Sequence, residues 1–300
     1  MIILKGQKKM KNSISGRSQY SGVDIFSSFT LIILGFWVVL TIIPVLYLIG
    51  LSLRSPLAVG ENILFIIPRQ LTLRNFVDAF PFIAEITVPL PRAFLNSVIY
   101  TVSGVAGAII MATLASFAFA TMKFRGKQLL FTVLLLGLVM PTSAMLLPEY
   151  VTVSALGLQN TIWALILPYI ALTMSLPILV ITSFFKQIPH ELYDAAKLDG
   201  CTPFKFLLYI GLPLARPALA TSIIWEFILL WNEFPLALVL LSKRTLYNLP
   251  LAVLSIMSDR SNPWNLISAT MIMASIPAIT IFILFQNYFI GGLTEGALKE

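Results

Sequence analysis

The sequence predicts an all-α membrane protein with six transmembrane helices, and three observations carry this prediction. Hydrophobic residues make up 58% of the 300-residue chain and charged residues only 11%, and the mean hydropathy is +0.91. This composition lies far outside the range of soluble globular domains. The apolar residues gather in long intervals, and most basic residues gather in the segments between them. We therefore expect the chain to fold in a lipid bilayer.

Six intervals are long and apolar enough to cross the hydrocarbon core, which takes about 20 helical residues. They are residues 29–53, 93–122, 128–148, 161–185, 217–242 and 264–290. Charged residues occur in one of them, 217–242, which contains Glu226 and Glu233. An ionised side chain at mid-membrane costs about 3 kcal/mol, and the surrounding apolar residues offset that cost. We expect the six helices to form a single transmembrane domain over residues 1–300.

The distribution of Lys and Arg predicts how this domain is oriented. Of the 20 Lys and Arg residues, 13 lie in 1–28, 123–127, 186–216 and the tail 291–300, and 7 lie in the other connections. Cytoplasmic segments of membrane proteins carry the excess of Lys and Arg. Both termini and the 186–216 loop are therefore expected to lie in the cytoplasm.

Two further expectations concern the N-terminal part of the chain. The interval 29–53 is longer than the apolar part of a secretory signal and ends without a small-residue cleavage site, so we expect it to remain as an anchor. The long outer loop that follows contains several prolines, and residues 73–82 within it are expected to form a short interfacial helix.

Several kinds of function are disfavoured by what the sequence lacks. One cysteine and one histidine exclude an internal disulfide and leave too few ligands for a zinc or haem site. The net charge of +7 is explained by the cytoplasmic loops, and no basic stripe with interleaved aromatic residues suggests nucleic acid. The phosphate-binding pattern G-x-x-x-x-G-K-[ST] does not occur, so the chain is not expected to bind ATP itself.

The cytoplasmic loop 186–216 has the pattern of a charged helix-turn-helix. Pro189 stops the preceding helix and suits the start of a new one. Glu191 and Asp194 then fall in its first turns, where carboxylates interact favourably with the positive end of the helix. Gly200 is expected to end this helix, because glycine adopts a positive φ at little cost.

A second short helix is expected directly after this turn. Thr202 suits the N-cap and Pro203 the first helical position. An apolar stripe at Phe204, Leu207 and Leu208 follows at helical spacing. We expect the pair at 212–213, Leu-Pro, to end this helix before the next membrane span.

The spacing of this loop matches a known pattern. It reads Asp194-Ala195-Ala196, three residues, Gly200, nine residues, Ile210, one residue, Leu212-Pro213. The string resembles the EAA loop of permease subunits of ATP-binding-cassette (ABC) importers, with Asp194 where that family usually has Glu. Further matches occur at 158–169, 184–189, Trp231-Asn232-Glu233-Phe234 and 285–299. The resemblance covers nearly the whole chain and narrows to carbohydrate-type permeases related to the six-span subunit of the maltose transporter.

This resemblance implies a type I importer fold and a set of partners. These are a second homologous permease, two ATPase subunits that bind ATP and Mg, and an extracytoplasmic solute-binding protein, all at the cell membrane. The chain itself would bind no cofactor and catalyse no reaction. ATPase motion would enter through a coupling helix, and the coupling residues would be Glu191, Asp194, Ala195, Ala196, Leu198, Asp199, Gly200, Pro203, Ile210, Leu212 and Pro213.

The resemblance leaves the transported solute open. It points to a sugar, an oligosaccharide or a related polyol, for which the chain would form half of the translocation path. Glycerol 3-phosphate or another non-sugar solute is the alternative. A structural membrane subunit is less favoured, and so is an intramembrane enzyme, because the six intervals contain no histidine or cysteine.

Four residues in the 217–242 interval are candidates for the translocation path. Glu226 and Glu233 are seven residues apart and are expected on nearly the same helix face. They could line the path with Trp231 and Asn232, or they could be buried carboxylates satisfied by neighbouring helices. Both interpretations stay open for Asn232 and Glu233, and the buried interpretation is favoured for Glu226. Trp231 could stack on a sugar ring, although packing is the commoner role of aromatic residues in spans.

Overall fold

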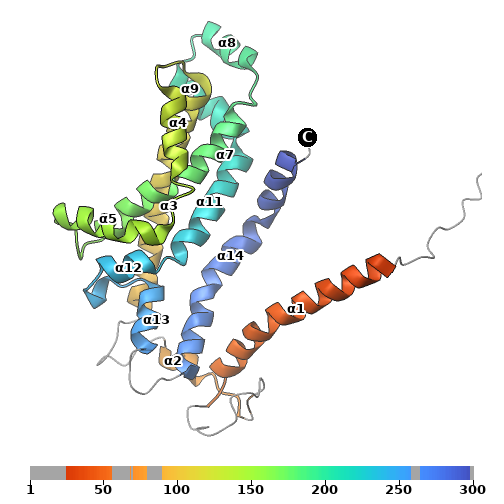
Figure 1. Cartoon of the computed structure of the whole chain (residues 1–300), viewed down its shortest axis with the longest axis vertical. Helices are drawn as coiled ribbons and strands as arrows, with labels where there is room; N and C mark the ends of the chain where they lie inside the picture. The colour runs from red at the N-terminus through yellow and green to blue at the C-terminus, as the bar shows by residue number, and fades with distance from the viewer. Residues whose placement is uncertain (1–24, 56–67, 69, 80–89, 258–263, 298–300) are drawn as a thin grey trace, which may run out of the picture. The chain divides into compact units, whose positions relative to one another are not determined.

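The computed structural model describes residues 25–55, 68, 70–79, 90–257 and 264–297. Within them the regular structure is helical, apart from one isolated antiparallel bridge between Arg54 and Leu71 (Figure 1). The all-α prediction is therefore confirmed. Contacts divide the chain into two compact units, 1–48 and 49–300, and the single transmembrane domain stays a prediction.

Helix α1 (Ile25–Ser52) supplies the described part of the first unit. Its residues from 29 to 46 are all exposed in the chain alone. They are also almost uniformly apolar, with no polar face. A helix that is hydrophobic on all sides has to be covered by lipid or by other helices. This agrees with the expectation that 29–53 crosses a membrane.

The second unit is built around the long helix α3 (Leu90–Thr121). It packs against α6 (Trp163–Thr173), α7 (Ser175–Phe185) and α11 (Arg216–Trp231), and α11 packs in turn against α14 (Trp264–Ala297). Small residues on α3, which include Gly104, Gly107, Ala108 and Ala112, let these helices approach closely.

Several predicted spans are broken into shorter helices. The interval 128–148 contains α4 (Lys127–Leu136) and α5 (Thr142–Ala155), and α5 runs across the direction of α4 (Figure 1). Pro141 lies directly before α5; it has no N–H to donate and disfavours a helical residue before it. The interval 161–185 is the pair α6 and α7, bent by 44°.

These breaks bear on the number of spans. By length and composition, three helical segments of the described residues can each cross a membrane alone: Phe29–Ser52, Leu90–Thr121 and Trp264–Gln286. Up to five are reached if each of two bent helix pairs counts as one span. The six-span count therefore stays a prediction.

Short helices occupy the end of the second unit that lies opposite α8 and α9 (Figure 1). They are α2 (Arg74–Ala79), which falls within the predicted interfacial helix at 73–82, and α13 (Leu249–Met257), which was not predicted. Helix α12 (Pro235–Leu240) and a 3-10 turn, Arg244–Leu246, precede α13.

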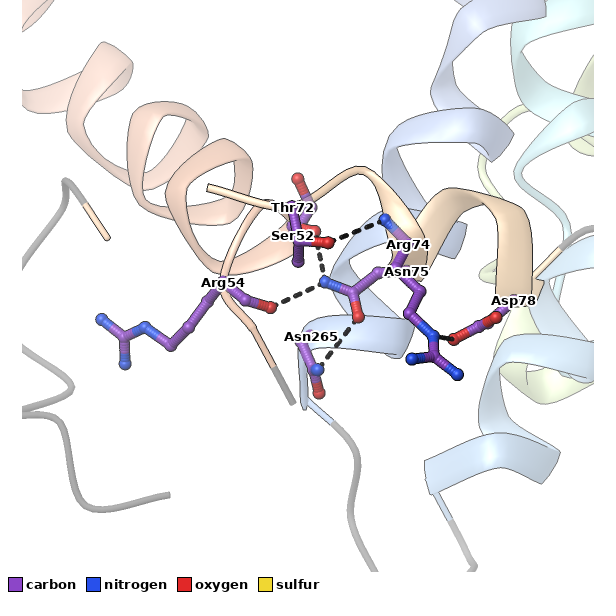
Figure 2. A network of polar contacts seen from close by, with 7 residues as sticks. All are labelled: Ser52, Arg54, Thr72, Arg74, Asn75, Asp78 and Asn265. Atoms are coloured by element: carbon purple, nitrogen blue, oxygen red, sulfur yellow. Dashed lines mark hydrogen bonds and ion pairs between the residues drawn. The ribbon is translucent and has the colours of Figure 1, made fainter. Parts of the chain in front are cut away.

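Asn75 on α2 is the centre of a polar cluster that holds this end together (Figure 2). Its amide nitrogen donates to the carbonyl oxygens of Ser52 (2.7 Å) and Arg54 (2.8 Å), at the point where α1 ends. Its amide oxygen accepts from the amide nitrogen of Asn265 at the start of α14 (3.1 Å). The side chain is 2% exposed. Asn75 therefore joins three segments that are far apart in the sequence.

Candidate functional site

Helix α8 (His190–Leu198) forms the tip of the predicted cytoplasmic loop. It begins after Pro189, as predicted, with Glu191 in its first turn and Lys197 in its last turn. Both charges interact favourably with the helix ends. All nine residues of α8, which lie within the described part of the chain, are exposed or half-buried. This helix therefore presents most of its surface outward.

Gly200 ends α8 in the predicted way. Its φ is +75°, in the left-handed region. The N–H of Gly200 donates to the carbonyl of Lys197 (3.1 Å), and the N–H of Cys201 donates to the carbonyl of Ala196 (2.9 Å). These two bonds define a Schellman motif. A Cβ added at Gly200 would meet none of the described residues within 4 Å, so glycine is required here for its conformation and not for space.

The second short helix starts as predicted and continues further than predicted. The Thr202 hydroxyl accepts from the backbone N–H of Lys205 (3.3 Å), and Pro203 is the first residue of α9 (Pro203–Phe206). The chain then continues through a π-helical turn, Leu207–Gly211, and α10 (Leu212–Leu214).

The expectation that Leu212-Pro213 ends this helix is therefore wrong. The helical segment ends at Ala215, where the direction changes by 78° into α11. A proline inside a helix clashes with the carbonyl four residues earlier. The wider turn at Leu207–Gly211 precedes Pro213, and in it Leu212 donates to the carbonyl of Leu207, five residues back. This π-type bond explains how the helix accommodates the proline.

Aromatic side chains attach the loop to the helical bundle. Tyr193 of α8 meets Phe206 edge to face with ring centroids 5.0 Å apart. Phe206 stacks on Phe117 of α3 (6.2 Å), and Phe117 meets Phe185 of α7 (5.9 Å). Of the apolar stripe predicted at Phe204, Leu207 and Leu208, Leu207 is buried and Phe204 is 60% exposed. Phe206, which is outside that stripe, and Leu207 are the residues that contact the bundle.

The predicted coupling residues lie together around this loop. Leu198 is 90% exposed, an extreme value for a leucine. Most of the others are exposed, namely Glu191, Asp194, Ala195, Asp199, Gly200, Pro203 and Pro213. Ala196, Ile210 and Leu212 are half-buried against the bundle. The loop therefore has an outer surface open to a partner and an inner surface fixed to α3 and α7.

The four candidates for the translocation path are arranged differently from the prediction. Helix α11 ends at Trp231, with Asn232 as its C-cap. Glu233 therefore lies in a break before α12, and Glu226 lies inside α11. The prediction that the two glutamates share one helix face is wrong, because α11 ends at Trp231 and Glu233 lies beyond that end. Pro235, which lacks an N–H and begins α12, was the local signal for this break.

The Glu233 side chain is held by protein groups. Its Oε2 accepts from the Tyr169 hydroxyl of α6 (2.7 Å) and from the N–H of Ala237 (3.3 Å), and its Oε1 accepts from the N–H of Leu236 (2.6 Å). The last two bonds cap the start of α12. Its backbone carbonyl accepts from the Asn248 side chain (2.8 Å). Both carboxylate oxygens are thus satisfied by neighbouring elements.

Trp231 and Glu226 are buried. Trp231 is 4% exposed, and its indole N–H donates to the Ala274 carbonyl of α14 (2.9 Å). Its ring stacks on Phe227 and meets Phe94 edge to face. These contacts support the packing interpretation. Glu226 is 0% exposed, and neither of its carboxylate oxygens has a hydrogen-bond partner among the described residues.

Comparison with known proteins identifies the family. Residues 104–294 match the family model described as the inner membrane component of binding-protein-dependent transport systems. The chain belongs to this family. The resemblance inferred from the EAA-like loop is therefore confirmed, and the chain is a permease subunit of an ABC importer, a transport component and not a catalytic one.

Named relatives of the permease cover most of its length. The trehalose transport system permease protein SugB of Mycobacterium tuberculosis is 33% identical over 260 residues, 86% of this chain and 92% of that one. The trehalose/maltose transport system permease protein MalG of Thermococcus litoralis is 30% identical over 264 residues, 87% and 92% of the two chains.

Solved structures show the fold of the permease. A crystal structure of a bacterial ABC transporter involved in import of the acidic polysaccharide alginate aligns with a TM-score of 0.77 and 22% identity. The alignment covers 88% of this chain and 96% of that one. The permease therefore has the type I ABC importer fold.

Proposed function

We propose that this permease forms half of the translocation path of an ATP-driven importer for a sugar, an oligosaccharide or a related polyol. The names of its relatives support the solute class, since they transport trehalose, trehalose and maltose, arabinooligosaccharides or diacetylchitobiose. Its partners would be a second homologous permease, two ATPase subunits that hold ATP and Mg, and an extracytoplasmic solute-binding protein. Both termini would face the cytoplasm.

The structure of the α8–α9 loop, residues 190–206, supports the proposal that movement of the ATPase subunits is transmitted to the permease at this loop. The outer surface of the loop is exposed at Leu198 and Phe204, and its inner surface is attached through Tyr193 and Phe206 to α3 and α7. A partner that moves the loop would therefore also move the bundle.

The energies involved are sufficient for such coupling. Burial of one large apolar side chain contributes about 1.5–3 kcal/mol. Reversal of a 1:99 equilibrium between two conformations takes about 5.5 kcal/mol. Two or three apolar side chains such as Leu198 and Phe204, if buried against a partner in one state only, would supply it.

The assembly is tested by purification of the tagged chain expressed from its native operon, in mild detergent, with mass spectrometry of the co-purifying proteins. We expect a second permease and an ATPase at comparable stoichiometry. Recovery of folded chain without an ATPase would contradict the importer function.

The solute class is tested with the purified complex in proteoliposomes, supplied with the solute-binding protein from the same operon. We expect ATP-dependent uptake of a labelled disaccharide or oligosaccharide. Uptake of glycerol 3-phosphate with no uptake of sugars would support the alternative solute.

A further inference from the structure

We propose that Trp231-Asn232-Glu233-Phe234 is a joint between two groups of helices, in which Glu233 is a positioning residue and not a ligand for the solute. We call residues 231–234 the joint. The proposal that the joint bends during transport rests on the proposed function. The roles assigned to its residues rest on contacts in the structure.

The first observation is that the helical hydrogen bonds are interrupted at the joint. The last bonds of α11 are long, with 3.4 Å from the Asn232 N–H to the Ile228 carbonyl and 3.3 Å from the Glu233 N–H to the Leu230 carbonyl. The Asn232 side chain bonds the Ile228 carbonyl as well (2.8 Å). Pro235 has no N–H to continue the ladder. A change of angle at the joint therefore breaks few backbone bonds.

The second observation is that the residues on either side of Asn232 are hydrogen-bonded to different helices. Trp231 donates to the Ala274 carbonyl of α14, and Glu233 accepts from the Tyr169 hydroxyl of α6. Trp231 also meets Phe94 of α3 in an aromatic edge contact. The side-chain hydrogen bonds of the chain thus change from α14 to α6 across the joint.

The third observation is that the chain beyond α12 is held firmly by side chains from other elements. Asn160, which has a positive φ of 56°, accepts from the N–H groups of Ser242 (2.6 Å) and Lys243 (2.9 Å). The Asn96 side chain of α3 donates to the carbonyls of Thr245 and Tyr247, both at 2.9 Å.

Two more bonds complete this attachment. The Tyr100 hydroxyl of α3 donates to the Leu246 carbonyl (2.9 Å), and the Ser97 hydroxyl accepts from the N–H of Leu249 (2.8 Å). Residues 242–249 therefore form one group with α12, α6 and the nearby end of α3. A displacement of α11 would be absorbed at the joint and not in this connection.

The other end of α11 is its N-terminus, where Ala215 is the N-cap. At this point the chain bends by 78° between the helical segment 203–214 and α11. The 16 residues of α11 span about 24 Å. A displacement of the loop would therefore move the N-terminal end of α11, and α11 would rotate about the joint at its C-terminal end. The Tyr169–Glu233 bond and the α12 cap would keep that end in place.

The first test compares Glu233→Gln, Tyr169→Phe and the double variant in the full transporter, with Tyr150→Phe as a control at an exposed tyrosine. We expect stoichiometric assembly in all four. We expect each single variant to lower the maximal uptake rate by about tenfold, as the loss of one charge-assisted hydrogen bond would. The half-saturating solute concentration should not change, and the double variant should be no worse than either single one.

Two outcomes of this test would overturn the proposal. A changed half-saturating concentration or solute preference in Glu233→Gln, with Tyr169→Phe silent, would show that Glu233 contacts the solute. Failure of both single variants to assemble would show that the contact only holds the subunit together.

The second test measures motion at the joint directly. Spin labels at the exposed residues Ile223 of α11 and Leu238 of α12, in a Cys201→Ser background, report the distance across the joint. We expect the distance to differ between the nucleotide-free and the vanadate-trapped transporter. An unchanged distance in a complex that contains the ATPase and transports solute would contradict the proposal that residues 231–234 bend during transport. It would not affect the proposed importer function. Absence of an ATPase would instead contradict the importer function.

Discussion

Gly200 is a single residue whose backbone conformation ends α8 in the 186–216 loop. Its positive φ completes two hydrogen bonds that end α8, and the space around it is open within the described part of the chain. Gly126, in the other predicted cytoplasmic turn, has a nearly identical φ of +78° and equally open surroundings. The two glycines therefore differ in location and not in backbone strain.

This pair provides a matched prediction. Gly200→Val and Gly126→Val each force a β-branched residue into the left-handed region, at a cost of at least about 1–2 kcal/mol. We expect Gly200→Val to abolish uptake at normal membrane levels and Gly126→Val to retain it. Uptake assays with quantified membrane protein check this. Normal transport by Gly200→Val, or equal losses in both variants, would speak against coupling through α8.

Two glutamates of one sequence interval give opposite predictions because their partners differ. Glu226 has no hydrogen-bond partner among the described residues, and Glu233 has three donors. We expect Glu226→Met to leave the free energy of unfolding unchanged or to raise it by up to about 2 kcal/mol. Glu233→Met leaves the buried Tyr169 hydroxyl and two N–H groups without an acceptor, and it should lower the free energy of unfolding by about 1–3 kcal/mol.

The thermal unfolding midpoint of the purified complex distinguishes the two variants, and uptake is measured alongside. Loss of uptake in Glu226→Met at unchanged stability would show that this carboxylate has a role in the translocation path.

Among the helices, local signals predicted the boundaries in the 186–216 loop, whereas contacts between distant residues contribute to the break after α11. Pro189, Gly200 and Thr202 act within a few residues of their own position, so the sequence predicted the boundaries that they set. The break at 232–234 depends in part on the bond between Tyr169 and Glu233, which are 64 residues apart. Hydropathy alone merged α11 and α12 into one interval, because both are apolar.

Helix α2 allows a prediction with an internal control. Asn75→Asp removes both donors and places carboxylate oxygens against the carbonyls of Ser52 and Arg54. We expect a loss of about 3 kcal/mol in the free energy of unfolding. Arg74→Ala on the same helix breaks only an exposed ion pair with Asp78 and should cost no more than about 1 kcal/mol.

Thermal unfolding of the two purified variants under the same conditions checks this difference. Equal midpoints would mean that the Asn75 cluster does not hold residues 52–54, α2 and α14 together (Figure 2).

At the scale of the whole molecule, composition and loop spacing predicted the class of protein and its family, and the comparisons confirmed both. The sequence did not predict the polar contacts that hold residues 242–247, because Asn96, Tyr100 and Asn160 bond to residues 82 to 151 positions away. No spacing rule indicates such contacts. These contacts explain why polar residues occur in otherwise apolar intervals without requiring them to contact solute.

We propose that an ATPase docks on the α8–α9 loop. A photo-crosslinking amino acid at Leu198, 90% exposed on α8, tests it in the assembled transporter, with Leu147 on α5, 71% exposed, as the control. We predict a crosslinked adduct with an ATPase subunit from position 198 and none from position 147. An ATPase that co-purifies but gives no adduct at 198, or gives one at 147, would contradict docking at this loop.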